Sequence, residues 1–140
     1  MKRTATAVWN GSGKDGKGNL TTQSTTLNKA QYSYKTRFEE GVGTNPEELL
    51  AAAHAGCYTM ALAFGLQGAG FTPDELETTA IVTFESTATP PTITKSHLEV
   101  KAKIPGISQE KFLELAKGAE QGCPVSRVLK AEISLDATLL

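Results

Sequence analysis

The feature that most constrains this chain is residues 49–70, a stretch that contains no Asp, Glu, Lys or Arg. Just before it, Asn45 is a good helix N-cap, Pro46 suits the first helical position, and Glu48 completes the spacing of a capping box. Gly68-Ala-Gly70 predicts where the helix ends. The sequence therefore predicts one long helix that is apolar on every side, and such a helix is usually buried on every side.

This predicted helix is long enough to cross a membrane, but its composition argues against a membrane span. His54, Gln67 and the many Ala and Gly residues make it too weakly apolar. A chain of 140 residues has difficulty surrounding so long a helix by itself. We therefore expect no membrane association and expect a partner subunit to cover part of the helix.

The other predicted elements are short strands and helices around the long helix. Strands are expected at 3–9, 19–27, 31–38, 77–87, 97–104 and 132–139, and helices at 109–121 and from 124 to about 131. The order βββ-α-ββ-αα-β predicts an α+β fold with a mainly antiparallel sheet around the long buried helix. The length predicts a single domain over residues 1–140.

Charge and composition exclude several classes of function. The 14 basic and 15 acidic side chains give a net charge of −1, so no basic face for nucleic acid is expected. The N-terminus lacks the apolar run of a signal peptide, so we expect a cytoplasmic protein, in which structural disulfides are uncommon. Two cysteines are too few for a Cys-rich zinc site, and His54 and His97 cannot easily complete one. We expect no metal and no bound organic cofactor.

The two cysteines are the candidates for chemistry. Cys57 lies in the middle of the apolar helix, where a free cysteine is most often a small packing residue. Cys123 precedes Pro124 at a helix start, where free N–H groups and the helix dipole lower the pKa of a thiol. An N-cap without chemistry is an equally good interpretation of Cys123. The residues alone leave open inert thiols, a redox pair, or one nucleophile with a bystander.

Two long motifs resemble a known family. Residues 43–57, GTNPEELLAAAHAGC, and residues 122–139, GCPVSRVLKAEISLDATL, resemble the OsmC family, the osmotically inducible protein C and organic hydroperoxide resistance group. The resemblance covers essentially the whole chain and is strongest to OsmC proper. It implies thiol-dependent reduction of small organic hydroperoxides to alcohols by an intertwined homodimer with its sites at the subunit interface. By position, it implies that Cys57 attacks the peroxide, Cys123 resolves it, and Arg37 and Glu47 form the charged pair.

Elementary thiol chemistry agrees with this assignment. A thiolate attacks the O–O bond to give a sulfenic acid and an alcohol, and a second thiol then condenses with the sulfenic acid. A dithiol reductant, which the family suggests to be of the lipoyl type on a lipoylated protein, reopens the disulfide. Arg37 would favour the thiolate and Glu47 would hold the guanidinium. Without the resemblance, Arg37 is a solvated cation at a strand end and Glu47 a favourable first-turn carboxylate.

Two expectations concern the arrangement of the site. Position alone nominates Cys123 as the more acidic thiol, but a charge partner such as Arg37 can outweigh burial, so we follow the resemblance in assigning the first attack to Cys57. Glu47 and Cys57 are ten residues apart on one predicted helix, which corresponds to about 15 Å. We therefore expect Glu47 to act on the thiol of the other subunit, with two antiparallel copies of the helix side by side.

Two alternative functions remain at this point. One is a non-enzymatic, dimeric, stress-associated ligand-binding or structural protein whose cysteines only pack. The other is thioester hydrolysis with His54, one turn before Cys57, as the base, although a hydrogen-bonded core histidine is the more common case. Five apolar side chains either wall a pocket suited to alkyl or aryl peroxides or belong to the core, namely Trp9, Phe38, Tyr58, Met60 and Phe64.

Overall fold

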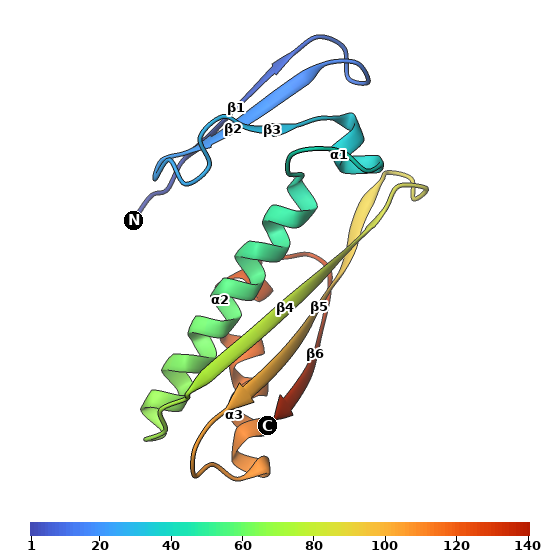
Figure 1. The fold of residues 1–140 in the computed structure, drawn as a ribbon. Coiled ribbons are helices and arrows are strands. Elements are labelled where there is room, and N and C mark those ends of the chain that lie inside the picture. Colours follow the sequence, from blue (N-terminus) through green and yellow to red (C-terminus); the bar gives the residue numbers. More distant parts are fainter. The chain divides into compact units, whose positions relative to one another are not determined.

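The structure is a computed structural model that describes all residues from 1 to 140. The chain divides into two compact units, Met1–Leu49 and Leu50–Leu140, called unit 1 and unit 2 below. Figure 1 shows the elements of both. The single domain over residues 1–140 stays a prediction.

Unit 1 contains a three-stranded antiparallel sheet in the order β1-β2-β3. Its strands are β1 (Ala5–Asn10), β2 (Lys17–Thr22) and β3 (Ala30–Tyr32), so the strands predicted at 3–9 and 19–27 are confirmed. Gly18 pairs with both Trp9 and Tyr32, whose rings are 5.4 Å apart between centroids. A Cβ at Gly18 would lie 2.4 Å from the Tyr32 ring, so only glycine lets the two rings meet across the central strand.

The prediction of a strand over residues 31–38 is wrong in its second half. Strand β3 ends at Tyr32, and residues Tyr34–Phe38 form helix α1. Ser33 caps this helix, because its hydroxyl accepts from the Thr36 N–H (3.3 Å) while the Thr36 hydroxyl accepts from the Ser33 N–H (2.9 Å). This reciprocal capping outweighs the β propensity of the segment and places Arg37 in a helical turn.

The long apolar helix is confirmed as α2 (Pro46–Gly68). Asn45 caps it through a 2.8 Å hydrogen bond from the Glu48 N–H to its side-chain oxygen. The Glu48 carboxylate accepts from the Thr44 hydroxyl (2.9 Å), so only half of the predicted capping box forms. The helix ends as predicted, with Gly70 at a φ of +85° and the Phe71 N–H bonded to Leu66 O (2.9 Å).

The expectation that α2 is buried on every side is wrong for a single chain. Its buried residues form one stripe, which consists of His54, Tyr58, Leu62 and Leu66. Met60 and Phe64, on other sides of the helix, are 61% and 65% exposed. By length and a mean hydropathy of 1.5, α2 could span a membrane, which is weak evidence because core helices of other proteins meet the same criteria.

Unit 2 is a three-stranded sheet covered on one face by helices. Its strands are β4 (Glu75–Glu85), β5 (Thr92–Lys103) and β6 (Glu132–Leu139). They lie in the order β4-β5-β6, with β4 antiparallel and β6 parallel to β5. The parallel pair needs a crossover, which α3 (Gln109–Gly122) and α4 (Pro124–Val128) provide. The mainly antiparallel α+β prediction is confirmed, with α1 as an added helix and two sheets in the chain.

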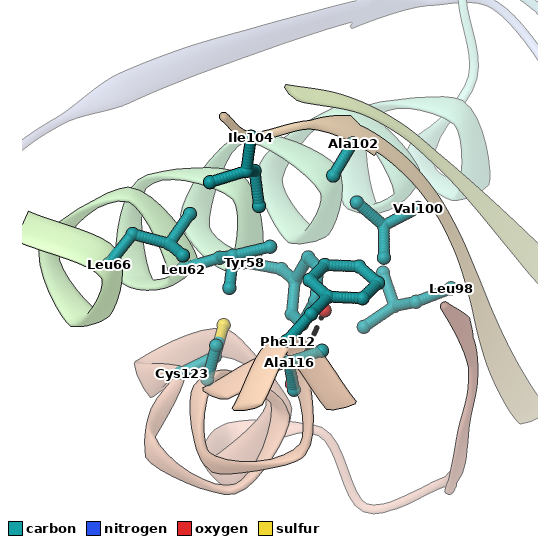
Figure 2. Packing of buried hydrophobic residues seen from close by; sticks show 11 residues of the cluster. Tyr58, Leu62, Leu66, Leu98, Val100, Ala102, Ile104, Phe112, Ala116 and Cys123 are labelled. Carbon is teal, nitrogen blue, oxygen red and sulfur yellow. Dashed lines mark hydrogen bonds between the residues drawn. The ribbon is translucent and has the colours of Figure 1, made fainter. Parts of the chain in front are cut away.

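The buried apolar cluster of the chain lies in unit 2, between its helices and its sheet. Leu98, Val100 and Ala102 of β5 alternate with exposed residues, so one face of the strand is apolar. Figure 2 shows this face against the α2 stripe and against Phe112 and Ala116 of α3. The cluster consists of Tyr58, Leu62, Leu66, Leu98, Val100, Ala102, Ile104, Phe112, Ala116, Ala119 and Cys123.

Candidate active site

The fold of unit 2 makes the two thiols neighbours, although they lie far apart in the sequence. Cys57 is on α2 and partly buried, and Cys123, between α3 and α4, is 0% exposed and part of the apolar cluster shown in Figure 2. Both are free, Cys57 packs against the cluster that contains Cys123, and each thiol shifts the pKa of the other. The fold of unit 2 therefore brings two reduced cysteines together.

The two thiols differ in acidity for physical reasons. Burial raises the pKa of Cys57, and the hydrogen bond that its S–H donates to Cys123 raises it further. Burial also raises the pKa of Cys123, but hydrogen bonds from the Ser126 N–H, Cys57, the Ser126 hydroxyl and the Val125 N–H outweigh it. The pKa of Cys123 is therefore below its usual value. Within one chain Cys123 is the more acidic thiol, as its position in the sequence indicates.

Arg37 and Glu47 form a preset charged pair in unit 1. Arg37 Nη2 and Nε lie 3.0 and 3.1 Å from one oxygen of Glu47, Oε1. The Asn45 side chain donates to Thr36 O (2.9 Å) and so ties α1 to the start of α2. The second oxygen of Glu47, Oε2, is buried and has no hydrogen-bond partner in the chain. Such an oxygen is costly to leave unsatisfied, so the pair is positioned for a further donor.

An aromatic pocket lies beside Arg37 in unit 1. Its volume is about 130 Å³, and its larger lining side chains are Trp9, Tyr32, Tyr34, Arg37, Phe38 and Pro46. The five residues predicted as pocket or core lie in three different environments. Trp9 and Phe38 line this pocket. Tyr58 is in the core, and Met60 and Phe64 are exposed. The sequence analysis missed Tyr32 and Tyr34. Their spacing around Arg37 could have indicated them, had residues 34–38 been predicted as a helix.

A second hollow lies between α2 and α3 in unit 2. It has a volume of about 530 Å³ and is lined mainly by small residues, which include Ala61, Gly65, Gly118, Ala119 and Gly122. Ala61 is one turn after Cys57, and Gly122 directly precedes Cys123. The small side chains leave this hollow near the two cysteines in sequence, although neither thiol lines it.

His54 is a fully buried, doubly hydrogen-bonded histidine. Its Nδ1 lies 2.7 Å from the Ser96 hydroxyl, and its Nε2 lies 2.7 Å from the Ser126 hydroxyl. Burial lowers the pKa of His54, although the nearby Glu120 opposes this shift. Because both ring nitrogens are engaged, His54 has no free nitrogen to act as a base on Cys57. This geometry favours the interpretation as a core histidine over thioester hydrolysis.

One further group of polar side chains has the composition of a metal site. Ligand atoms of His97, Glu99 and Asp136 lie within 4.8 Å of one another. His97 is held by Ser134 (2.6 Å) and by Asp136 (3.2 Å), and both carboxylates are exposed. Hydrogen bonds of the His97 ring on the sheet surface account for this cluster, so we assign no metal to it.

Fold and site together define an α+β protein with a neighbouring pair of free thiols and a separate, preset Arg–Glu pair. The model of the family described as OsmC-like protein matches residues 39–138. Peroxiredoxin OsmC of Escherichia coli is 48% identical over 95% of this chain and 93% of its own length. The organic hydroperoxide resistance protein of Xanthomonas axonopodis is 29% identical over 71% of this chain and 68% of its own.

A solved structure shows the same fold at lower identity. The organic hydroperoxide resistance protein OhrB of Bacillus subtilis superimposes with a TM-score of 0.68 at 21% identity, over 98% of both chains. The chain belongs to the OsmC-like family. The family predicted from the two sequence motifs is thereby confirmed.

Proposed function

We propose that this chain is a thiol-dependent peroxidase that reduces organic hydroperoxides to alcohols through Cys57 and Cys123. The observation that carries the proposal is that Cys57 packs against the buried cluster that contains Cys123, so the fold brings together two free thiols from distant parts of the sequence. The names of the relatives support it, since one is a peroxiredoxin and another an organic hydroperoxide resistance protein.

Exposure supports Cys57 as the thiol that meets the peroxide. Cys57 is partly exposed, whereas Cys123 is 0% exposed and cannot meet a substrate first. The Cys57 thiolate attacks one peroxide oxygen, so that an S–O bond forms and the O–O bond breaks. The alkoxide that leaves takes up a proton and becomes the alcohol. Cys57 is left as a sulfenic acid next to the second thiol.

Acidity supports Cys123 as the resolving thiol. The hydrogen bonds that lower its pKa keep a larger share of it as the thiolate, the reactive form. Its attack on the sulfenic acid gives an intrachain disulfide and water. A dithiol reductant, of the lipoyl type in the family, reopens this disulfide by exchange. The cycle uses no metal and no bound cofactor.

The Arg37–Glu47 pair would favour the Cys57 thiolate and orient the peroxide. Both Glu47 and Cys57 lie on α2, where ten residues correspond to about 15 Å, too far for their side chains to meet. We therefore assign the pair to Cys57 of the partner subunit in an intertwined, cytoplasmic homodimer. The aromatic pocket beside Arg37 would take the organic part of the hydroperoxide.

Exposed apolar surface on α2 supports the dimer. Met60 and Phe64 are more than half exposed on a helix that has no charged residue after Glu48. Exposed apolar groups gathered on one element mark an interaction surface. A second copy of the chain would also offer a donor for the buried, unpartnered Glu47 Oε2.

Titration with cumene hydroperoxide and counting of free thiols tests the proposal. One equivalent per chain should remove both thiols and give an intrachain disulfide by mass spectrometry. Cys57→Ser should leave Cys123 unreacted, and Cys123→Ser should give a sulfenic acid at Cys57 that dimedone traps. If both thiols persist in the wild-type protein, the cysteines are packing residues and the proposal is wrong. If the peroxide oxidises Cys123 before Cys57, the roles of the two thiols are reversed.

A further inference from the structure

The positive charge of this chain is concentrated in its first part. Residues 1–38, all in unit 1, contain seven basic side chains and one acidic side chain. Residues 39–140 contain seven basic and fourteen acidic side chains. The net charge of −1 for the whole chain therefore conceals a strong asymmetry. A surface with an excess of one sign of charge raises the local concentration of ions of the opposite sign, so residues 1–38 attract anions.

Three of these basic side chains line one pocket of unit 1, called the lysine pocket below. Its volume is about 310 Å³, and its lining includes Lys14, Lys17 and Lys35, one acidic residue, Asp15, and the uncharged Gln31 and Ser33. The three lysines come from the β1–β2 loop, the start of β2 and helix α1. The pocket therefore has an excess of positive charge from three separate elements.

The lysines of this pocket have no acidic partner within the chain. The lysines that form ion pairs all lie in unit 2, namely Lys95, Lys103, Lys111 and Lys117. Asp15 is held in its own turn, where its N–H donates to the Ser12 hydroxyl (3.1 Å) and its carboxylate lies 3.4 Å from the same oxygen. Each lysine ammonium is a point charge on a flexible stem, so all three are available to an anion from outside the chain.

The lysine pocket adjoins the aromatic pocket beside Arg37. Ser33 lines both pockets. In the β1–β2 loop, Gly13 lines the aromatic pocket and the next residue, Lys14, lines the lysine pocket. In α1, Lys35 lines the lysine pocket and Arg37 lines the aromatic pocket. One elongated ligand can therefore occupy both pockets, with one end beside Arg37 and the other beside the lysines.

A side chain of the aromatic pocket also fixes the loop that carries Lys14. The Trp9 indole N–H donates to Gly11 O (3.1 Å) and to Ser12 O (3.2 Å). The Gly16 N–H donates to the same Ser12 oxygen (2.8 Å) and closes the loop. The walls of the two pockets are thus connected by hydrogen bonds within unit 1.

We propose that the lysine pocket is a subsite for the carboxylate of hydroperoxides that carry one, and that Lys14, Lys17 and Lys35 determine this specificity. The inference rests on the proposed function, because it names a substrate class for the same site. The –OOH group lies at Arg37, the hydrocarbon part lies against the aromatic side chains, and the carboxylate reaches across Ser33 to the lysines. The chemistry at the O–O bond is that of the proposed function, and the lysines take no part in it.

Charge decides in which direction such a substrate binds. Arg37 lies 3.0 Å from a Glu47 oxygen, so its positive charge is already balanced. The lysine pocket has three positive groups and one negative group. The carboxylate, which is ionised at neutral pH, is therefore attracted to the lysines, and the uncharged –OOH group is left for Arg37. Because the carboxylate does not change during the reaction, the lysines bind substrate and transition state equally, which lowers KM and leaves kcat unchanged.

Direct binding tests the inference without any turnover. Trp9 is the one tryptophan of the chain and lines the aromatic pocket, so its emission reports a ligand there. The probes are 4-isopropylbenzoate and 4-isopropylbenzamide, which differ in charge and contain no peroxide. The benzoate should bind about tenfold more tightly, the effect expected for one charge-assisted hydrogen bond. This preference should decrease as the ionic strength is raised.

Variants separate the lysine pocket from the general charge of unit 1. Lys35→Met should reduce the preference for the benzoate to about threefold, since a single exposed charge contributes little. The triple variant Lys14→Met, Lys17→Met and Lys35→Met should abolish it. The matched control is Lys29→Met, which removes an exposed lysine of unit 1 that lines neither pocket, and it should keep the full preference.

Turnover of matched hydroperoxides completes the test. Cumene hydroperoxide with a para-carboxylate should have a KM about tenfold below that of its para-carboxamide, at equal kcat. The inference is overturned if the wild-type protein binds the benzoate no more tightly than the benzamide. It is also overturned if Lys29→Met reduces the preference as much as Lys35→Met. Failure of the proposed function is a separate result, in which neither hydroperoxide is reduced although the benzoate binds more tightly.

Discussion

Different kinds of interaction stabilise unit 1 and unit 2 of this chain. Every residue of the buried apolar cluster belongs to unit 2, and the buried residues of unit 1 include Thr36 and Thr44 but no apolar side chain. The thiols lie in the unit whose side chains are fixed by packing. The Arg37–Glu47 pair and the aromatic pocket lie in the unit that is fixed by polar contacts. Apolar packing thus places the two sulfur atoms, whereas hydrogen bonds place the charged pair in a different part of the molecule.

Because of this difference, unit 1 needs a further source of stability. A unit of fewer than 50 residues without an apolar core gains little from burial and needs another source of stability. Strand pairing, the Ser33–Thr36 capping box and the Asn45 hydrogen bond supply part of it. A partner subunit that covers unit 1 would supply the rest, in agreement with the proposed dimer.

The largest expected effect tests where the stability comes from. Phe112→Ala removes a fully buried ring from unit 2 and should lower the free energy of unfolding by about 3–5 kcal/mol. The matched change in unit 1, Val8→Ala, affects a side chain that is 45% exposed and should cost less than about 1 kcal/mol. Urea denaturation followed by circular dichroism measures both. Equal losses would contradict the contrast between the units.

The next effect separates chemistry from stability. Arg37→Met removes the positive charge of the Arg37–Glu47 pair and should lower kcat/KM for cumene hydroperoxide about a hundredfold, the usual loss when a preorganised electrostatic group is removed. The unfolding midpoint of unit 2 should stay unchanged. Lys95→Met, which breaks an exposed 3.6 Å pair with Glu132, is the control and should keep full activity. If the activity of Arg37→Met falls only as far as its folded fraction falls, Arg37 is not part of the site.

A smaller effect is expected on assembly. Phe64→Lys places a charge on the exposed side of α2 and should weaken the dimer at least about tenfold, because a desolvated charge at an apolar interface is unfavourable. Val128→Lys, at a side chain that is 76% exposed on α4, is the control. Sedimentation velocity over a concentration series measures both. A wild-type protein that stays monomeric at all concentrations would exclude the assignment of Glu47 to the partner subunit.

The sequence predicted most elements because their signals are local. Asn45 before Pro46, the glycines after residue 67, and Ser108 before α3 mark helix ends by chemistry that acts within one turn. The alternation of Leu98, Val100 and Ala102 with polar residues is a local signal of the same kind, and these side chains form the buried face of β5. The error at residues 34–38 came from a local signal too, since Ser33 and Thr36 favour both a strand and a capping box. Strand pairing decides between them, because β3 pairs with β2 only as far as Tyr32.

By itself, the sequence determined the family, the long apolar helix and the identity of the two thiols, because motifs and periodicity are properties of neighbouring residues. The tertiary structure decided which groups surround each thiol. Cys57 packs against the cluster that contains Cys123, and His54 bridges Ser96 and Ser126 across three elements whose packing no local pattern specifies. The acidity of a thiol depends on its burial and on the hydrogen bonds it receives, and both are set only when distant segments pack together.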